Sequence, residues 1–421
     1  MSRISLAGRT IYIPQMSYGG ARCLAAAFQS VGLQAQPTPD SDAETLELGG
    51  RFTSGDECLP ERITLGDFLK ITRLPGFDPE KTAFLMPTAG GPCRFGQYEG
   101  LLRKVVKEQG LEDVLVFSPT AANAYEDMGG RVFIRTGWRA VVAADGLQKL
   151  LHHTRPYESH RGDSDAVYEE WLGRMCEAIA LKSDHKNRLR KMVQVMTEAC
   201  ERFRAVPKRH DPGRPLIGVV GEIYCRHNFF SNENLIRKVE EHGGEAWLSD
   251  LGEWVWYTIQ DERRNLRIDG KRFSKAMLGN RIRSVIQRAD EHALINPLHD
   301  YLRGLEEPED ITVLLKGCEP YLPFDGALGE MVLSVGKAVY LYEKGADGII
   351  DISPFTCMNG IVCEAVYPRI SREHENIPIR NFYFDGTAVD LDRDVGIFIE
   401  LARNYQRRKT KINSSHLAGQ H

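Results

Sequence analysis

The sequence Leu216-Ile-Gly-Val-Val-Gly-Glu-Ile-Tyr224 has the continuous apolar character of a strong buried β-strand. It follows residues 206–215, a basic stretch with three prolines that is typical of a linker. A helix is expected over 232–241, and the glycine pair Gly243–Gly244 ends it. A strand followed by a polar loop, a helix and a second apolar segment indicates a parallel sheet with helices on both faces.

The opening of the chain has the same order of elements. A short apolar strand at 10–14 precedes a helix over 21–31, which ends at Gly32. Two further apolar strands, at 84–87 and 114–118, alternate with helical sequence. The predicted fold class is therefore α/β, with two Rossmann/flavodoxin-like domains whose parallel sheets are related by a degenerate repeat, plus a helical insertion.

A change to charged, amphipathic sequence sets the expected domain boundaries. Residues 141–210 have apolar side chains at helical spacing among Lys, Arg and Glu, and they are assigned to a helical segment and linker. The first α/β domain is expected over 1–140 and the second over 211–421. Within the second domain, apolar strands are expected at 311–315 and 349–353.

The composition of the 421 residues argues against several classes of protein. A hydrophobic content of 42% and a charged content of 27% are those of a soluble globular protein. The net charge of −4 gives no reason to expect a nucleic-acid or membrane-surface partner. No stretch approaches the roughly 18 apolar residues of a membrane span, and the N-terminus lacks the apolar core of a signal peptide. The chain is expected in the cytoplasm, where thiols stay reduced.

Nine cysteines in such a chain favour metal binding over disulfides. Loops at the carboxyl ends of parallel strands converge at one edge of a sheet, where open α/β sheets bind their ligands. Structural zinc prefers paired Cys-x-x-Cys knuckles, and the sequence has none. Widely separated single cysteines favour an iron–sulfur cluster held between domains. Five cysteines lie beside an expected strand end or helix start, namely Cys58, Cys93, Cys225, Cys318 and Cys357.

The other four cysteines have different expected roles. Cys176 and Cys200 lie in the charged helical segment, which favours packing between helices. Cys23 lies on an apolar helix face, which favours a place in the core. Cys363 comes shortly after Cys357 and either lines the same cavity or packs beneath it.

Four motifs resemble the 2-hydroxyacyl-CoA dehydratase superfamily. They are Ser54-Gly-Asp-Glu-Cys58-Leu-Pro, Thr88-Ala-Gly-Gly-Pro-Cys93-Arg-Phe-Gly-Gln-Tyr98, Gly221-Glu-Ile-Tyr-Cys-Arg226 and Pro354-Phe-Thr-Cys357-Met-Asn-Gly. The resemblance extends from Ile11 to about Tyr405, and the Cys93 motif is highly specific. Within the superfamily, the chain looks most like the double-cubane cluster proteins.

The resemblance implies a ligand set. Dehydratase subunits hold one four-iron cubane through three cysteines, which Cys58, Cys93 and Cys357 match. A double-cubane cluster, [8Fe-9S], joins two such cubanes through a sulfide and needs roughly six thiolates. Cys23 is the spare cysteine and the alternative to Cys363. The implied ligands are Cys58, Cys93, Cys225, Cys318, Cys357 and Cys363.

The resemblance also implies an enzyme with a partner. An ATP-dependent reductase with its own [4Fe-4S] cluster would supply electrons, and the double cubane would pass them to a small-molecule substrate. The chain itself has no Gly-x-x-x-x-Gly-Lys-Ser/Thr run for binding ATP. Such proteins are typically homodimers. The alternatives are a single-[4Fe-4S] component of a 2-hydroxyacyl-CoA dehydratase and a non-enzymatic cluster carrier.

Polar residues near the cysteines are candidate functional groups. Glu222 and His227 flank Cys225 and are the candidate proton donors. Arg94 and Arg226 are candidates to offset the negative charge of the cluster. The alternative for Arg94, Arg226 and His227 is that they are surface or hydrogen-bonding loop residues.

Two more pairs of residues complete the predictions. Glu57 and Tyr98 are further candidate proton donors beside the first cysteines. His152 and His153 lie in the helical segment and are expected to be exposed to solvent.

Overall fold

The computed structural model describes two compact units of this chain. The described residues are 6–88, 93–118, 130–209, 211–325, 329–387 and 390–418. Unit 1 comprises Met1–Leu150, Ala166–Ala205 and Asp250–Tyr301. Unit 2 comprises Leu151–Asp165, Val206–Ser249 and Leu302–His421.

The units are interleaved along the sequence rather than consecutive. The expected first domain, 1–140, lies within unit 1, and most of the expected helical segment, 166–205, belongs to unit 1 as well. The expected second domain, 211–421, is divided, because Asp250–Tyr301 belongs to unit 1. The chain therefore passes from one unit to the other several times.

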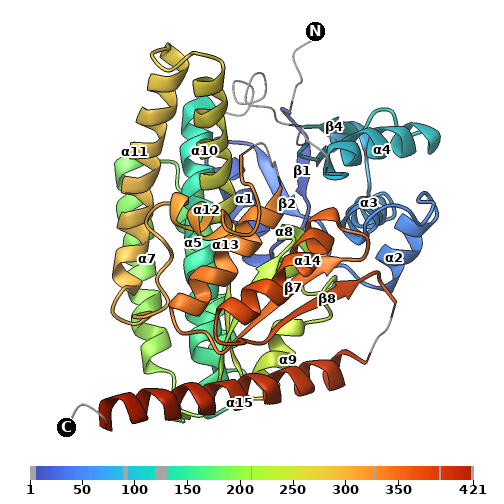
Figure 1. Cartoon of the computed structure of the whole chain (residues 1–421). Helices are drawn as coiled ribbons and strands as arrows, with labels where there is room; N and C mark the ends of the chain where they lie inside the picture. The colour runs from blue at the N-terminus through green and yellow to red at the C-terminus, as the bar shows by residue number, and fades with distance from the viewer. Residues whose placement is uncertain are drawn as a thin grey trace. The chain divides into compact units, whose positions relative to one another are not determined.

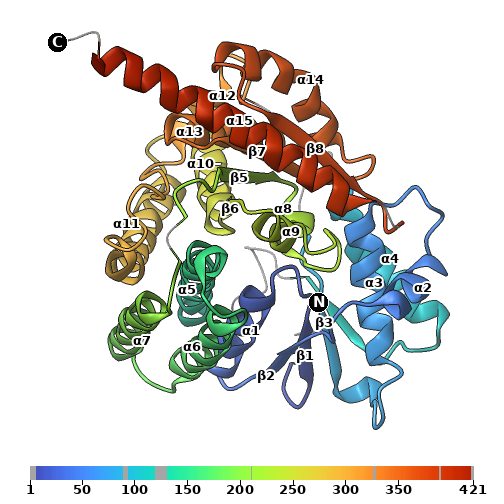
Figure 2. The same ribbon diagram turned by 90° about the horizontal axis from the view of Figure 1, so that it is seen from below.

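Unit 1 is built on a parallel sheet of four strands in the order β2-β1-β3-β4 (Figures 1 and 2). The strands are β1 (Thr10–Ile13), β2 (Gln34–Pro37), β3 (Thr82–Leu85) and β4 (Leu115–Phe117). In the register of the sheet, Thr10 lies opposite both Gln34 and Thr82. Every residue of β3 is buried, which explains its continuous apolar sequence. Strand β2 lies at the edge of the sheet, where its glutamines are tolerated.

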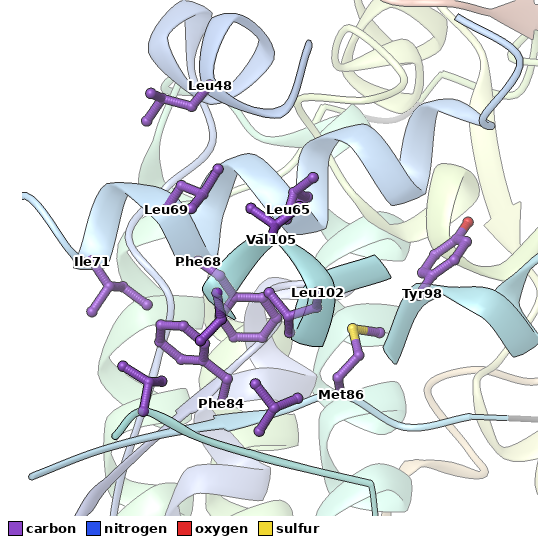
Figure 3. Packing of buried hydrophobic residues seen from close by; sticks show 13 residues of the cluster. Leu48, Leu65, Phe68, Leu69, Ile71, Phe84, Met86, Tyr98, Leu102 and Val105 are labelled. Atoms are coloured by element: carbon purple, nitrogen blue, oxygen red, sulfur yellow. The ribbon is translucent and has the colours of Figure 1, made fainter. Parts of the chain in front are cut away.

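Four helices connect or follow these strands. They are α1 (Tyr18–Gln29), α2 (Ala43–Gly50), α3 (Leu59–Ile71) and α4 (Phe95–Glu108), with a 3₁₀ turn, η1 (Pro79–Lys81), before β3. Ser17 caps α1 by accepting a hydrogen bond from the Gly20 amide, and Asp42 caps α2 through a capping box with Thr45. Figure 3 shows the core that α2, α3, α4 and β3 share, where the rings of Phe68 and Phe84 lie 4.5 Å apart.

Long helices complete unit 1. They are α5 (Gly130–Thr154), α6 (Asp163–Ala180), α7 (His185–Ala205), α10 (Gly252–Ile268) and α11 (Lys275–Ile295), with the turn η3 (Asn296–Leu298). Helix α5 is joined to α11 by a buried ion pair between Arg139 and Asp290 at 2.8 Å. Because neither side chain of this pair is exposed to water, the pair fixes how the two helices pack.

Unit 2 repeats the architecture of unit 1, with the strand order β6-β5-β7-β8 and all strands parallel. The strands are β5 (Leu216–Gly221), β6 (Glu245–Leu248), β7 (Gly348–Pro354) and β8 (Ile379–Phe384). The helices are α8 (Ile223–His227), α9 (Leu235–Glu241), α12 (Thr312–Cys318), α13 (Glu330–Glu343), α14 (Met358–Glu373) and α15 (Leu391–Ala418), with the turn η2 (Arg155–Tyr157).

The two units share a strand order and a close helix contact. A Cβ atom added to Gly66 of α3 would lie 1.9 Å from the Thr45 carbonyl oxygen of α2. A Cβ atom added to Gly336 of α13 would lie 2.0 Å from the Leu314 carbonyl oxygen of α12. The predicted α/β class with two parallel sheets is therefore confirmed.

One predicted strand is wrong. Residues 311–315 were expected as an apolar strand, but Thr312–Cys318 forms helix α12, which packs against α13. Leu314 and Leu315 are buried whereas Val313 is 44% exposed, so one face of a helix is covered and the other is not. A short apolar run does not distinguish these two structures by its periodicity.

No helix among the described residues is both long enough and apolar enough to cross a membrane.

Candidate functional site

Cys58 occupies the N-cap position of α3. Its backbone is extended, with φ −72° and ψ 153°, and Pro60 lies in the first turn of the helix. The Cys58 sulfur lies 2.6 Å from the hydroxyl oxygen of Tyr98 on α4, and the two share a hydrogen bond. The half-buried thiol is therefore held at a helix N-terminus, where a negative charge is favoured.

Cys93 lies next to this position. It is exposed and comes just before α4, whose N-cap residue is Arg94. The Arg94 guanidinium donates a hydrogen bond to the backbone carbonyl of Asp56. Together with the contact between Tyr98 and Cys58, this bond joins the two cysteine motifs of unit 1.

A polar pocket of about 370 Å³ is lined by residues that precede and follow Cys58 in the chain. Burial, together with the neighbouring Glu57 carboxylate, raises the pKa of its Glu61 carboxyl to about 7, although Arg94 opposes both. Glu57 itself accepts hydrogen bonds from the Ser54 and Gly55 amides, which lower its pKa although burial opposes them. The pocket is lined by Asp56, Glu57, Glu61, Arg94, Gln97 and Leu101.

In unit 2, the corresponding edge of the sheet begins where β5 ends. Gly221 has φ +119°, and a Cβ atom there would lie 2.1 Å from the Ile352 carbonyl oxygen of β7, so only glycine fits. Glu222 follows as the N-cap of α8, and its carboxylate accepts hydrogen bonds from the Tyr224 and Cys225 amides at 3.0 and 2.8 Å. The fully buried Cys225 is thereby fixed at the end of the strand.

A second buried carboxyl group meets Glu222. Glu330, at the start of α13, accepts a hydrogen bond from the Ile223 amide at 3.0 Å. Burial and the Glu222 carboxylate raise the pKa of Glu330 to about 8. Burial also raises the pKa of Glu222, although the Cys225 and Tyr224 amides lower it in part. The two carboxyl groups therefore hold at least one proton near neutral pH.

Arg226 and His227 are buried, so of the alternative of surface or hydrogen-bonding residues only the surface position is excluded. Arg226 is 3% exposed and donates a hydrogen bond to the Gly221 carbonyl at 3.0 Å, within reach of both carboxyl groups. His227 is 1% exposed, and burial together with Arg226 lowers its pKa well below the usual value. His227 is therefore neutral at physiological pH, and its lowered pKa makes it a weak proton acceptor.

The expected exposure of two further histidines is also incorrect. His152 is 3% exposed, and burial followed by the charge of Arg155 lowers its pKa. His153 is half-buried, with its Nδ1 atom 2.7 Å from a carboxylate oxygen of Glu245. The reason lies in the packing of residues 151–165 within unit 2, which sequence spacing does not reveal.

Three cysteines of unit 2 lie close to one another. Cys357 is the N-cap of α14, with φ −66° and ψ 121°, and Cys363 lies further along the same helix. Burial raises the pKa of the Cys363 thiol well above its usual value, and Cys318 and Cys357 contribute. Burial also raises the pKa of Cys318 and of Cys357 to about 12. Backbone groups of Asn359 and Gly360 partly oppose this at Cys357.

The remaining cysteines lie among the helices of unit 1. Cys23 is fully buried and its thiol is hydrogen-bonded to that of Cys176, on α6. Cys200 is buried on α7. None of the nine cysteines, all within the described residues, forms a disulfide. Cys23 therefore lies in a helical core of unit 1, whereas Cys363 lies beside Cys357 in unit 2.

Glu61 and Glu330 were not among the functional residues expected from the sequence. Both lie in the first turn of a helix, where acidic residues are common for the helix dipole alone. Their burial, 5% and 8% exposed, distinguishes them from ordinary first-turn carboxylates. The signal available in the sequence was a Glu at a helix start, followed by apolar residues at the spacing of a buried helix face.

Comparisons with known proteins name no family. No protein-family model matches the chain, and a search of curated proteins finds no relative. Within the described residues, no three His, Cys, Asp or Glu side chains form a preformed metal site.

The donor set nonetheless suits a soft metal. Cys318 and Cys357 both contribute to the raised pKa of Cys363, and the backbone at the start of α14 interacts favourably with the charged form of Cys357. Thiolate ligands near amide groups are the usual environment of iron–sulfur clusters. Thiols with such high pKa values release their protons when a metal ion replaces them. A soft metal in unit 2 would therefore take its ligands from these thiols.

Proposed function

We propose that this protein is an iron–sulfur reductase that holds an [8Fe-9S] double-cubane cluster and reduces a small molecule. Its electrons would come from an ATP-hydrolysing partner reductase with its own [4Fe-4S] cluster. The proposed ligands are Cys58 and Cys93 of unit 1 and Cys225, Cys318, Cys357 and Cys363 of unit 2.

The main support is the matching position of two cysteines. Cys93 follows β3 and precedes α4, and Cys357 follows β7 and precedes α14. Strands β3 and β7 hold the same place in the two sheet orders. A cysteine after the third strand of both sheets lies at the edge where α/β proteins bind their ligands. Packing alone gives no reason for a thiol at both positions.

The unit 2 thiols give further support. Since Cys318 and Cys357 have pKa values raised to about 12 by burial, they are neutral at physiological pH without a cation. Buried cysteines also occur as small packing residues, so the support lies in the position of Cys357 at a strand end and not in burial alone. When bound, the cluster would store electrons at low potential.

The neighbouring polar residues would balance the negative charge of the cluster and supply protons. The Glu330 carboxyl, whose pKa is raised to about 8, keeps a proton close to Cys357. Arg226 supplies a buried positive charge on the same side of β5. Glu222 holds the Cys225 backbone in place and shares the proton with Glu330. The chain can thus supply a proton to a reduced substrate, with Glu330 as the donor.

The test is the iron and acid-labile sulfide content of protein purified without oxygen. We expect roughly eight iron ions and about nine sulfides per chain. The variant Cys318→Ser is expected to lose about half of the iron, and the matched control Cys200→Ser, a buried thiol of α7, to lose none. Reduction by an ATP-dependent reductase of this class would then be followed in the visible spectrum.

Other results would contradict the proposal in specific ways. About four iron ions per chain, unchanged by Cys318→Ser, would favour a single [4Fe-4S] dehydratase component. A full cluster that accepts electrons but reduces no small molecule would favour a cluster carrier. Zinc or no metal in protein that was never exposed to oxygen would exclude all of these. Sedimentation of the loaded protein tests the proposed homodimer.

A further inference from the structure

Helix α11 buries several polar side chains and exposes apolar ones. Its buried residues are Asn280, Gln287 and Asp290 together with Met277 and Leu294. Asp290 pairs with Arg135 and Arg139, and the Asn280 amide donates a hydrogen bond to the Ile259 carbonyl at 3.1 Å. This departs from an ordinary surface helix, whose apolar face is the buried one.

The exposed face of α11 has a continuous apolar seam. Leu278, Ile282 and Val285 are 59, 52 and 70% exposed, and Ala289 is exposed as well. These positions are separated by four, three and four residues, the spacing of a coiled-coil seam. Ile286 lies beside them, 38% exposed. Figure 1 shows α11 paired with α10 along its other side.

The turn before α11 extends the same surface. Phe273 is 97% exposed, and Ile268, at the end of α10, is 67% exposed. Scattered apolar residues on a surface need no explanation, but a seam with regular spacing and an aromatic residue at its end marks a place for a partner. We call the surface of Ile268, Phe273, Leu278, Ile282, Val285 and Ile286 the α11 seam.

The charges around the α11 seam are positive. The acidic residues of this hairpin are already paired, Glu262 with Arg283, Asp269 with Lys271 and Glu291 with Arg288. Four exposed cations have no ion pair among the described residues, namely Arg267, Arg272, Lys275 and Arg281. An apolar seam with unpaired cations on its margins complements a surface of opposite charge.

We propose that the α11 seam binds an amphipathic helix of another protein, with apolar residues at coiled-coil spacing and acidic residues on its flanks. A second copy of this seam is a poorer fit, because it would bring the same four cations together. The described part of the C-terminal helix α15 is also unsuitable, since its last turns are basic. This proposal goes beyond the proposed function and holds whether or not iron is bound.

The experiment uses two designed helical peptides and the full chain. Both peptides have Ile and Leu at the seam positions, and one has Glu and the other Lys at all flanking positions. Because the flanking charges of each peptide are all alike, two copies of the same peptide repel each other. Each peptide therefore stays monomeric and free to bind the protein. Fluorescence anisotropy at low salt should give the Glu peptide a Kd on the order of 10 µM, and the Lys peptide at least about tenfold weaker binding.

Two variants and a control locate the binding. Val285→Asp should weaken binding of the Glu peptide by at least about tenfold, because it puts a like charge in the middle of the seam. Val313→Asp, which changes an exposed apolar residue of α12, should have no effect. Arg281→Glu, an exposed position, should reduce the preference for the Glu peptide and serves if Val285→Asp fails to fold.

Four results would overturn the proposal. Equal binding of both peptides would show that charge does not select the partner. Binding that Val285→Asp leaves unchanged, or no binding at all, would exclude the seam as the site. A dimer in sedimentation that Val285→Asp converts to a monomer would make a second copy the occupant.

Discussion

Of the proposed ligands, Cys93 of unit 1 is exposed and Cys58 is half-buried, whereas Cys225, Cys318 and Cys363 of unit 2 are buried and Cys357 is half-buried. Both units have the same strand order. The same architecture therefore presents thiols in two ways. Water reaches the exposed thiol of unit 1, whereas a thiol in a core that excludes water keeps its proton unless a metal ion or unfolding removes it.

The largest expected difference between the units is the rate of thiol alkylation. In reduced, metal-free protein, Cys318 should react with iodoacetamide at least about 10⁴-fold more slowly than Cys93, because it must wait for unfolding. Peptide mass spectrometry after timed quenching measures each site. In the control variant Cys93→Ser, the rapidly alkylated peptide assigned to Cys93 should be absent. Equal rates for Cys318 and Cys93 would mean that the unit 2 thiols are not enclosed.

The arginines that follow Cys93 and Cys225 sharpen the comparison. Arg226→Gln should lower the free energy of unfolding by about 4 kcal/mol, because it leaves the Glu222 and Glu330 carboxyl groups without their cation. Arg94→Gln, at an exposed position, should cost at most about 0.5 kcal/mol. Urea denaturation measures both.

The loss in Arg226→Gln should depend on pH. Burial raises the pKa of Glu330 to about 8 in the folded protein, so the folded state holds a proton that the unfolded state releases above about pH 4. The variant should therefore be closer to the parent at pH 5, where the carboxyl groups are protonated, than at pH 9. A loss that is the same at both pH values would contradict the charge argument.

Adding a side chain at the close helix contacts of Gly66 and Gly336 should lower the free energy of unfolding to the same extent in the two units. Gly66→Ala and Gly336→Ala should each cost about 3 kcal/mol, because a Cβ atom would lie within 2.0 Å of a backbone carbonyl oxygen. The matched controls Gly100→Ala and Gly173→Ala have no atom within 4 Å of the added Cβ, and they should stabilise their helices by about 0.5 kcal/mol. A clear difference between Gly66→Ala and Gly336→Ala would show that the repeated helix pairs are not equivalent.

The smallest expected effect concerns a buried acid of unit 1. Burial raises the pKa of Asp67 to about 7, although hydrogen bonds from Ser41 and Thr45 lower it in part. The folded state therefore keeps a proton that the unfolded state loses above about pH 4, and this contribution to stability disappears as the pH rises through 7. Asp67→Asn should gain about 2 kcal/mol over the parent at pH 8 and nothing at pH 4. Parallel pH profiles in urea would contradict this.

Strands with continuous apolar sequence could be predicted from the sequence, as β3 and β7 were, because parallel strands are buried on both faces. The edge strand β2 could not, because Gln34 and Gln36 alternate with small residues. Helix α12 was mistaken for a strand, since four apolar residues fit either structure. The interleaving of the units has no local signal at all.

The residues of the candidate site also differ in how far the sequence predicts them. Glu222 was identified because it lies beside Cys225 in the chain, and its carboxylate does bind that residue's amide. Glu330 was missed because its partner, Ile223, is 107 residues away. The burial of His227 and His152 likewise depends on packing that brings distant segments of unit 2 together.

The interleaved units have a consequence for synthesis of the chain. Unit 1 needs Asp250–Tyr301, so it cannot be complete until that segment has left the ribosome. By then β5 and β6 have emerged, while β7 and β8 are still to be made. Asp290 is synthesised about 150 residues after its partner Arg139, so the Arg139 guanidinium has no counter-ion to be buried with until then. Nascent chains that stop before Tyr301 should therefore depend on chaperones more than finished ones do.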